Sequence, residues 1–189
     1  MNFKTYCLSL KSDVARRNWM ISIKEKIGLD FEFFDAITPE EITDDIVEKY
    51  FEHANFYEWD INQKAVMATF MSHMKLLELA VKNKENILII EDDTYIIRPF
   101  NWNNIDFSSF DVFKISRRGV YCYAYFVSYN GAINLLNYLN SKKIELAYDW
   151  ELEKCRGLNI KTIDRPVFIQ TFTFPSNIAP NGYKKIKNL

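Results

Sequence analysis

The sequence is poor in the residues that mark several common protein classes. Its three cysteines, Cys7, Cys122 and Cys155, are an odd number and lack the paired CxxC spacing of zinc sites, so we expect free thiols in a reducing compartment. With five glycines in 189 residues, the chain has no Gly-rich phosphate loop and no GxSxG nucleophile elbow. These absences disfavour P-loop enzymes, hydrolases built on that elbow, and zinc proteins.

Long apolar runs and an excess of charge are also missing. No stretch approaches the roughly 18 apolar residues of a membrane span, and the N-terminus has no apolar leader. Because 24 basic residues balance 25 acidic ones, no overall field favours a nucleic-acid partner. The basic C-terminal tail, 180–189, is either solvated or in weak contact with an anionic membrane surface. We expect a cytoplasmic protein, at most peripheral at the inner face of the membrane.

What is present fits one globular domain over residues 1–189, with 48% hydrophobic residues and no low-complexity segment. The pattern predicts strands over 3–10, 31–36, 87–90, 112–115, 121–128 and 160–163. It predicts helices over 13–26, 62–81, 132–139 and 149–156, and a short one from a capping box at Thr38 toward Tyr50. This alternation indicates an α/β fold with a mostly parallel central sheet and helices on both faces.

The most informative segment is the apolar run 87–90 followed by Glu91-Asp92-Asp93. Ligands collect at the carboxyl ends of strands in open α/β sheets, and three adjacent carboxylates need a cation nearby. Hard oxygen ligands suit Mg²⁺ or Mn²⁺. Because side chains alternate across a strand, we expect Asp93 as the first metal ligand, with Glu91 assisting from the same face. The alternative is a solvated acidic turn.

A second acidic pair, Asp149 and Glu151, lies at a predicted helix start. Sugar transfer with inversion needs a base for the acceptor proton, and either carboxylate has the right chemistry. Acids are also favoured in the first turn of any helix, so a capping role is the competing interpretation. His73, beside Ser72 on the long helix, has the groups to bind a diphosphate or ribose, or is simply structural.

Two further features belong to the same set of candidates. Arg16 suits bidentate contacts with phosphate, although exposed helix arginines are common. Tyr121, Tyr123 and Tyr125 alternate along a predicted strand, where they stack on a sugar or pack in the core.

Seven short segments, in their order along the chain, together carry a resemblance to a known family. They are Cys7-Leu8-Ser9-Leu10 with Arg16-Arg17, Phe33-Phe34-Asp35-Ala36, Phe70-Met71-Ser72-His73, Ile90-Glu91-Asp92-Asp93, Tyr123 to Ser128 with Gly131-Ala132, Tyr148-Asp149, and Pro166, Gln170 and Ser176-Asn177-Ile178. Together they resemble glycosyltransferase family 25, which includes lipopolysaccharide, lipooligosaccharide and collagen galactosyltransferases. Tyr148 departs from the family's usual small or proline-containing approach to the aspartate.

The resemblance implies a GT-A type, Rossmann-like domain that uses a UDP-sugar donor, most often UDP-galactose. It implies usually inverting transfer to a saccharide or glycolipid acceptor of a cell-surface glycan such as lipooligosaccharide, with Mn²⁺ or Mg²⁺. By this likeness Asp93 and Glu91 bind the metal, and Asp149 is preferred over Glu151 as catalytic base. The donor-binding residues would be Ser9, Leu10, Arg16, Asp35, Ala36, Ser72, His73, Glu91, Asp92 and Gln170.

The metal ligands and the activity leave alternatives open. GT-A enzymes often add a histidine ligand near the C-terminal end, but this chain has no histidine after His73. Gln170 or Asp164 would then substitute, or water and diphosphate oxygens would complete the coordination. The competing functions are a non-catalytic nucleotide- or sugar-binding relative and a nucleotidyltransferase.

Overall fold

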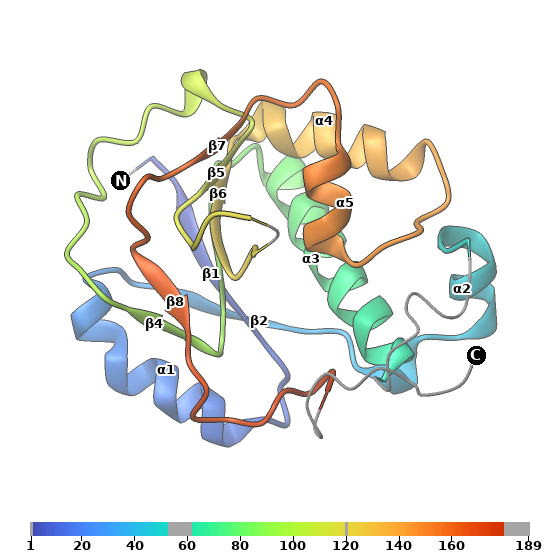
Figure 1. Ribbon diagram of the computed structural model, residues 1–189, viewed down its shortest axis with the longest axis horizontal. Helices are drawn as coiled ribbons and strands as arrows, with labels where there is room; N and C mark the ends of the chain where they lie inside the picture. Colours follow the sequence, from blue (N-terminus) through green and yellow to red (C-terminus); the bar gives the residue numbers. More distant parts are fainter. Residues whose placement is uncertain (1, 53–61, 120, 180–189) are drawn as a thin grey trace.

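The computed structural model describes residues 2–52, 62–119 and 121–179, so the tail predicted over 180–189 lies outside the described residues. The central strands are β1 Lys4–Ser9, β2 Glu32–Asp35, β3 Ile87–Glu91, β5 Val112–Lys114, β6 Ala124–Val127 and β7 Ile160–Thr162. They form one sheet in the order β2-β1-β3-β6-β5-β7 (Figure 1). The pairs β1–β2, β1–β3 and β5–β7 are parallel, whereas β6 is antiparallel to both neighbours. The predicted mostly parallel sheet is confirmed.

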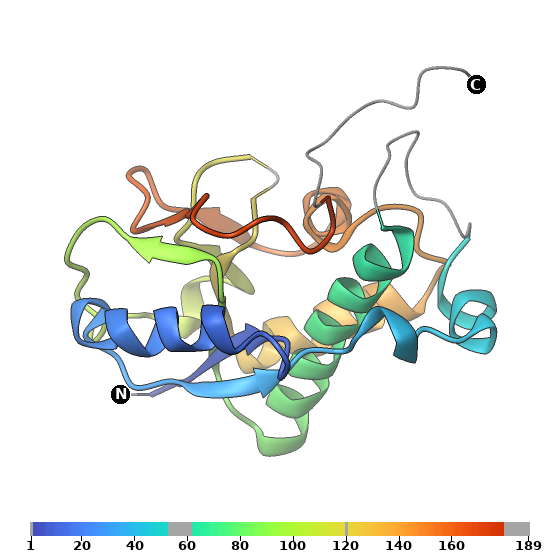
Figure 2. The same cartoon turned by 90° about the horizontal axis from the view of Figure 1, so that it is seen from below.

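Helices cover both faces of this sheet (Figures 1 and 2). The main ones are α1 Val14–Ile27, α3 Gln63–Asn83 and α4 Tyr129–Asn140, and the shorter ones are α2 Asp44–Tyr50 and α5 Tyr148–Lys154. Single 3₁₀ turns lie at Pro39–Glu41 and Phe107–Ser109. A separate antiparallel pair, β4 Thr94–Ile96 and β8 Phe168–Gln170, lies on the same side as α1.

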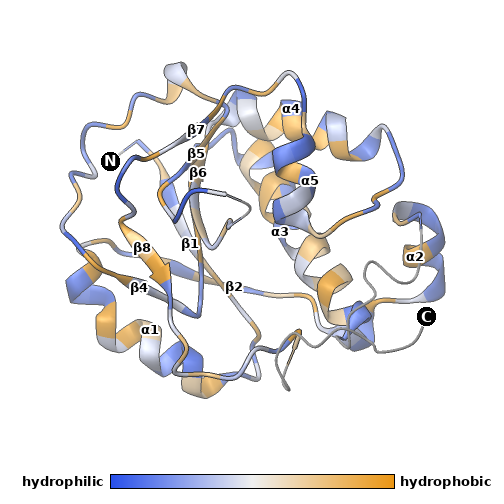
Figure 3. Cartoon of the chain, in the orientation of Figure 1, coloured by the Kyte–Doolittle hydropathy of each residue, from blue (hydrophilic) through white to orange (hydrophobic). Residues whose placement is uncertain are grey.

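Alternation along the central strands produces two apolar cores. Ile87 and Ile89 of β3 pack in the core formed with α3 and α4, whereas Leu88 and Ile90 pack with α1 and the small sheet. Figure 3 shows hydrophobic residues interrupted by hydrophilic ones along α1 and α3, as expected of helices covered on one side. The sheet is therefore buried on both faces, and its polar end groups are held rigidly.

The predicted limits of α1 are confirmed. The Asp13 side chain accepts a hydrogen bond from Arg16 N at 3.2 Å, and Gly28 ends the helix with φ 68°. That left-handed conformation favours glycine because it has no Cβ. None of the described helices is both long and apolar enough to cross a bilayer.

Three local predictions were wrong. The capping box at Thr38 begins a 3₁₀ turn, and α2 starts separately with Thr43 as its cap. Residues 121–123 precede β6 rather than belonging to it, so Tyr123 and Tyr125 pack in opposite cores and not along one face. The cap of α5 is Ala147, which places Asp149 inside the first turn instead of at the cap.

Candidate active site

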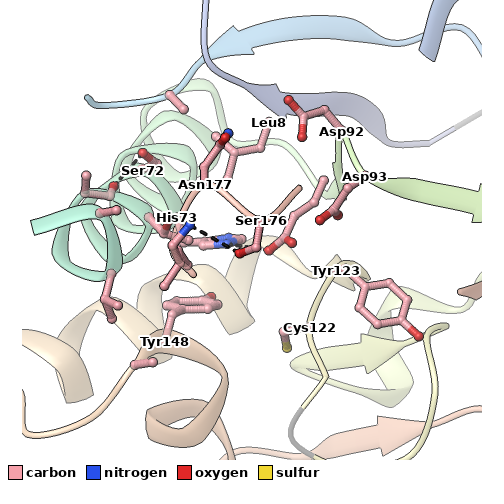
Figure 4. A pocket seen from close by; sticks show the side chains of 18 of the residues that line it. Leu8, Ser72, His73, Asp92, Asp93, Cys122, Tyr123, Tyr148, Ser176 and Asn177 are labelled. Atoms are coloured by element: carbon pink, nitrogen blue, oxygen red, sulfur yellow. Dashed lines mark hydrogen bonds and ion pairs between the residues drawn. The ribbon is translucent and has the colours of Figure 1, made fainter. Parts of the chain in front are cut away.

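A cavity of about 500 Å³ lies where β1 and β3 end, between α3, the start of α5 and residues 176–178. Strand ends of this kind are where open α/β sheets bind ligands. All of the predicted site residues line the cavity except Asp35 and Glu151. Those at the cavity are Ser9, Leu10, Arg16, Ala36, Ser72, His73, Glu91, Asp92, Asp93, Asp149 and Gln170. Figure 4 shows Asp92 and Asp93 on one side and the rings of His73 and Tyr148 on another.

Arg16 supplies a cation that the acidic triplet needs. Its Nη1 lies 2.8 Å from Asp92 Oδ1 and 3.6 Å from Asp93 Oδ2, and its Nη2 donates to Pro175 O at 2.7 Å. Ser9 Oγ donates to the other Asp92 oxygen at 2.7 Å. The Arg16 side chain is 6% exposed, so its role in this structure is to join the triplet to the C-terminal segment. Both carboxylate oxygens of Asp92 are therefore engaged, one by Ser9 and the other by Arg16.

Asp93 is the acid whose surroundings fit a metal ion. Its Oδ2 accepts a hydrogen bond from Gln170 Nε2 at 2.9 Å, whereas its Oδ1 is buried with no partner among the described residues. Burial raises the pKa of Asp93 to about 7. A buried acceptor without a donor is costly, and a hard cation would satisfy it.

Few protein groups in the described part of the chain are available to bind a metal ion beside Asp93. In the described part of the chain no three His, Cys, Asp or Glu side chains gather as a metal-binding group. A metal held here would thus rely on Asp93, with Glu91 two residues away, and on substrate and water oxygens. Mg²⁺ commonly binds in this way, through one or two carboxylates plus substrate phosphates. Asp164 pairs with Arg118, is 88% exposed and does not line the cavity.

His73 is enclosed by a hydrogen-bonded network. Nδ1 lies 2.8 Å from Tyr125 Oη, Nε2 lies 3.2 Å from Glu91 Oε1, and the ring stacks on Tyr148 with centroids 4.3 Å apart. Tyr125 Oη in turn donates to Tyr148 Oη at 3.1 Å. Both ring nitrogens are engaged, so the structural interpretation of His73 is favoured over diphosphate binding.

The protons in this network can be placed. Burial lowers the pKa of His73 to about 3 and raises that of Glu91 to about 8, so at neutral pH the imidazole is uncharged and Glu91 is mostly protonated. Because Tyr125 donates to Tyr148, its oxygen accepts from His73 Nδ1–H, which leaves Nε2 to accept the Glu91 proton. Bound metal would instead favour the charged form of Glu91.

Asp149 reaches the cavity from the first turn of α5. Its Oδ1 accepts a hydrogen bond from Trp150 N at 3.0 Å. Burial raises the pKa of Asp149 to about 6. A carboxylate with a pKa near the working pH is well matched to general base catalysis.

Two predicted site residues, Glu151 and Asp35, do not line the cavity. Glu151 is fully buried outside the cavity, where Oε1 accepts from Glu145 N and Leu146 N and Oε2 pairs with Lys142. Asp35 pairs with Arg17 and lines a neighbouring hollow.

Ser72 does line the cavity, but its Oγ donates to Ala68 O and accepts from Ile37 N. The Ser72 hydroxyl therefore stabilises the fold at the edge of the cavity.

The structure also distinguishes the two candidate bases, because Asp149 lines the cavity and Glu151 does not. Their spacing in the sequence could not make this distinction.

Several lining residues were not among the predicted site residues. They include Trp150 and the segment Ser176-Asn177-Ile178, which is tied to the chain before α3 by Asn62 N donating to Ile178 O at 2.8 Å. Tyr121, which the sequence offered as a residue that stacks on a sugar or packs in the core, also lines the cavity. Residues 176–178 carried a motif signal in the sequence. The only sequence signal for Trp150 was its position next to Asp149. Because 16% of the residues in the chain are aromatic, that position alone could not single out this one.

Comparisons with known proteins show which family the chain resembles. Residues 2–109 match the sequence profile of Glycosyltransferase family 25 (LPS biosynthesis protein). A Haemophilus influenzae protein named "Putative glycosyltransferase" is 30% identical over 176 residues, which cover 76% of this chain and 60% of that protein. An Aedes aegypti "Glycosyltransferase 25 family member" is 31% identical over 94 residues, 47% of this chain and 16% of that protein.

A solved structure shares the fold. The crystal structure of a glycosyltransferase involved in the glycosylation of the major capsid of PBCV-1 matches with a TM-score of 0.53 and 10% identity, over 92% of this chain and 95% of that one. At that identity the likeness shows the fold alone. The chain spans about 60% of the Haemophilus influenzae relative and a much smaller share of the Aedes aegypti one.

Proposed function

Because this chain belongs to glycosyltransferase family 25, we propose that it transfers a sugar from a nucleotide-sugar donor to a saccharide hydroxyl. The family description as an LPS biosynthesis protein supports a cell-surface glycan, such as lipooligosaccharide or a glycolipid, as acceptor. The site motifs resemble those of enzymes that use UDP-sugars, which supports UDP-galactose as the first donor to test. The chain spans only part of the length of these relatives, so the acceptor is proposed here and is not carried over from them.

The observation that carries the proposal is the meeting of two different carboxylates in one cavity. Asp93 presents a buried oxygen without a partner at the end of β3, and Asp149 presents a carboxylate with a raised pKa from α5. In a metal-dependent inverting sugar transfer, one carboxylate takes the acceptor proton and another holds the metal ion that stabilises the leaving diphosphate.

In the proposed reaction, Asp149 takes the proton of the acceptor hydroxyl as that oxygen attacks the anomeric carbon of the donor. The new bond forms on the face opposite the leaving group, so the anomeric configuration inverts. The bond from the anomeric carbon to the diphosphate breaks, and its electron pair leaves with UDP. Asp93, with Glu91, would hold Mn²⁺ or Mg²⁺, which supplies Lewis-acid stabilisation of the diphosphate charge when bound.

An assay of UDP release tests the function. The protein is mixed with UDP-galactose, UDP-glucose or UDP-N-acetylglucosamine, Mn²⁺ and a panel of methyl glycosides, and we expect acceptor-dependent UDP release. A folded sample that turns over no UDP-, GDP- or CMP-sugar contradicts the proposal. Nucleotide binding in calorimetry without turnover would indicate a non-catalytic relative, and pyrophosphate release from a nucleoside triphosphate would indicate a nucleotidyltransferase.

The metal site is tested by thermal shift. UDP with Mn²⁺ should raise the melting temperature of the parent protein by several degrees, because ligands that bind only the native state stabilise it. Asp93→Ala should lose the Mn²⁺-dependent part of that rise and keep the part given by UDP alone. Asp164→Ala is the matched control, since its carboxylate lies outside the cavity. An unchanged Mn²⁺-dependent rise in Asp93→Ala would move the metal elsewhere.

A further inference from the structure

Two exposed aromatic side chains line the candidate active-site cavity. Trp150 of α5 is 46% exposed, and Tyr121, in the loop before β6, is 41% exposed. The other exposed large hydrophobic residues of the described chain do not line the cavity: Val14, Ile21, Ile97, Ile169 and Phe172. Single exposed apolar residues are ordinary, but two aromatic rings at one cavity form a surface that can bind a ligand.

Trp150 is also fixed to the candidate base. It follows Asp149 in the first turn of α5, and its backbone N–H donates to Asp149 Oδ1 at 3.0 Å. A ring bound against Trp150 would therefore carry its hydroxyl groups close to the carboxylate that takes the acceptor proton. This places Trp150 beside the candidate base, which is the acceptor side of the proposed reaction.

A buried lysine connects the elements that carry the two rings. Lys114 of β5 has no exposed side-chain surface, and its Nζ donates to Gly119 O in the loop before Tyr121 and pairs with Glu153 of α5. A buried ammonium group is stable only when its hydrogen bonds are made, so both partners are held in place. Glu153 lies one helical turn after Trp150. Lys114 thereby sets the spacing between the loop and α5.

We propose that Trp150 and Tyr121 form the acceptor subsite, where they stack on a pyranose ring of a saccharide, and that Lys114 is a positioning residue for this pair. The inference rests on the proposed transferase function and names its acceptor chemistry. A pyranose has an apolar face of C–H groups that suits the electron-rich face of an aromatic ring. Its hydroxyl groups point outward from that face, toward water and Asp149.

Kinetics with the saccharide acceptor test the subsite. The probes are the methyl β-glycosides of galactose, glucose and lactose, with UDP-galactose as donor. Trp150→Ala should raise the acceptor KM about 10-fold or more, as the loss of a stacked ring implies. Trp150→Phe should restore most of the affinity, whereas Trp150→Leu, which is apolar but has no ring, should not. The thermal shift given by UDP should stay at the parent value in all three.

Phe172→Ala is the matched control, because Phe172 is 93% exposed and lies outside the cavity, and it should leave the acceptor KM unchanged. Glu153→Gln, milder than any change at buried Lys114, should raise the acceptor KM while the UDP shift is retained. A parent-like KM in Trp150→Ala would overturn the subsite and leave the transferase function standing.

A parent protein without turnover would contradict the function and still permit a test of the subsite. Methyl β-lactoside should then quench the tryptophan fluorescence of the parent but not of Trp150→Phe. Equal quenching of the two proteins, or none in the parent, would overturn the subsite.

Discussion

Three neighbouring acids have three different roles, and the difference lies in what each side chain meets. Glu91 faces the uncharged His73, Asp92 is paired with Arg16 and Ser9, and Asp93 keeps one buried oxygen without a described partner. The alternation of a strand predicts that Glu91 and Asp93 differ from Asp92. It does not predict that Glu91 is protonated, because that depends on a histidine 18 residues away in the chain.

Replacing Glu91 with Gln tests its protonation. The pKa of Glu91 is raised from 4.5 to about 8 in the folded protein, so between those values the folded state holds a proton that the unfolded chain has lost. The stability due to this group is complete below pH 4.5 and is lost as the pH rises through about 8. Glu91→Gln, whose amide also donates to His73, should match the parent near pH 4.5 and melt several degrees higher above pH 8.

Melting curves of both proteins across this pH range provide the measurement. Because His73 is present in both, its own titration at low pH cancels in the comparison. A Gln variant that is equally or less stable than the parent above pH 8 would show that folding does not raise the pKa of Glu91, so that the group is charged at neutral pH in the folded protein.

At the scale of elements, the strands of the central sheet and the main helices were predictable, whereas the small separate sheet was not. The helix predicted over 62–81 is α3, and the strands predicted over 3–10 and 31–36, with the helix between them, are β1, β2 and α1. The strands β4 and β8 pair only with each other, and their pairing joins Thr94 to Gln170, which are far apart in the sequence. This unpredicted pair is what brings Gln170 to Asp93.

Arg16 joins elements that are far apart in the sequence, and its removal should be costly. Arg16→Met would leave Asp92 buried without its cation and free the C-terminal segment at Pro175, at a cost of about 3–5 kcal/mol in the free energy of unfolding. Arg17→Met is the neighbouring control. Its main ion pair is with Asp35, which is 52% exposed, so we expect a loss of about 1 kcal/mol.

Urea unfolding of the two variants measures these free energies. Equal losses would mean that Arg16 contributes no more to the free energy of unfolding than its neighbour Arg17. Such a result would contradict the inference that Arg16 holds the acidic turn and the C-terminal segment together.

At the scale of the whole molecule, the topology brings the candidate site together. Residues from β1, α3, the turn after β3, α5 and residues 170–178 line one cavity, although they span most of the chain. Most of the residues that the sequence motifs predicted for the site line this cavity. It could not predict that β6 lies between β3 and β5, or that Glu151 turns away from Asp149, because both depend on contacts between distant segments.

The most direct test of the central claim is the mass of the acceptor after incubation with UDP-galactose and Mn²⁺, compared between the parent and Asp149→Asn. The parent should add one hexosyl residue to a methyl glycoside, at a rate that rises with pH through about 6 as Asp149 loses its proton. Asp149→Asn should lower that rate by about 10²–10⁴-fold while UDP still raises its melting temperature. A folded parent that never changes the mass of any acceptor, or an Asp149→Asn variant that transfers at the parent rate, would contradict the claim that this cavity carries out sugar transfer with Asp149 as base.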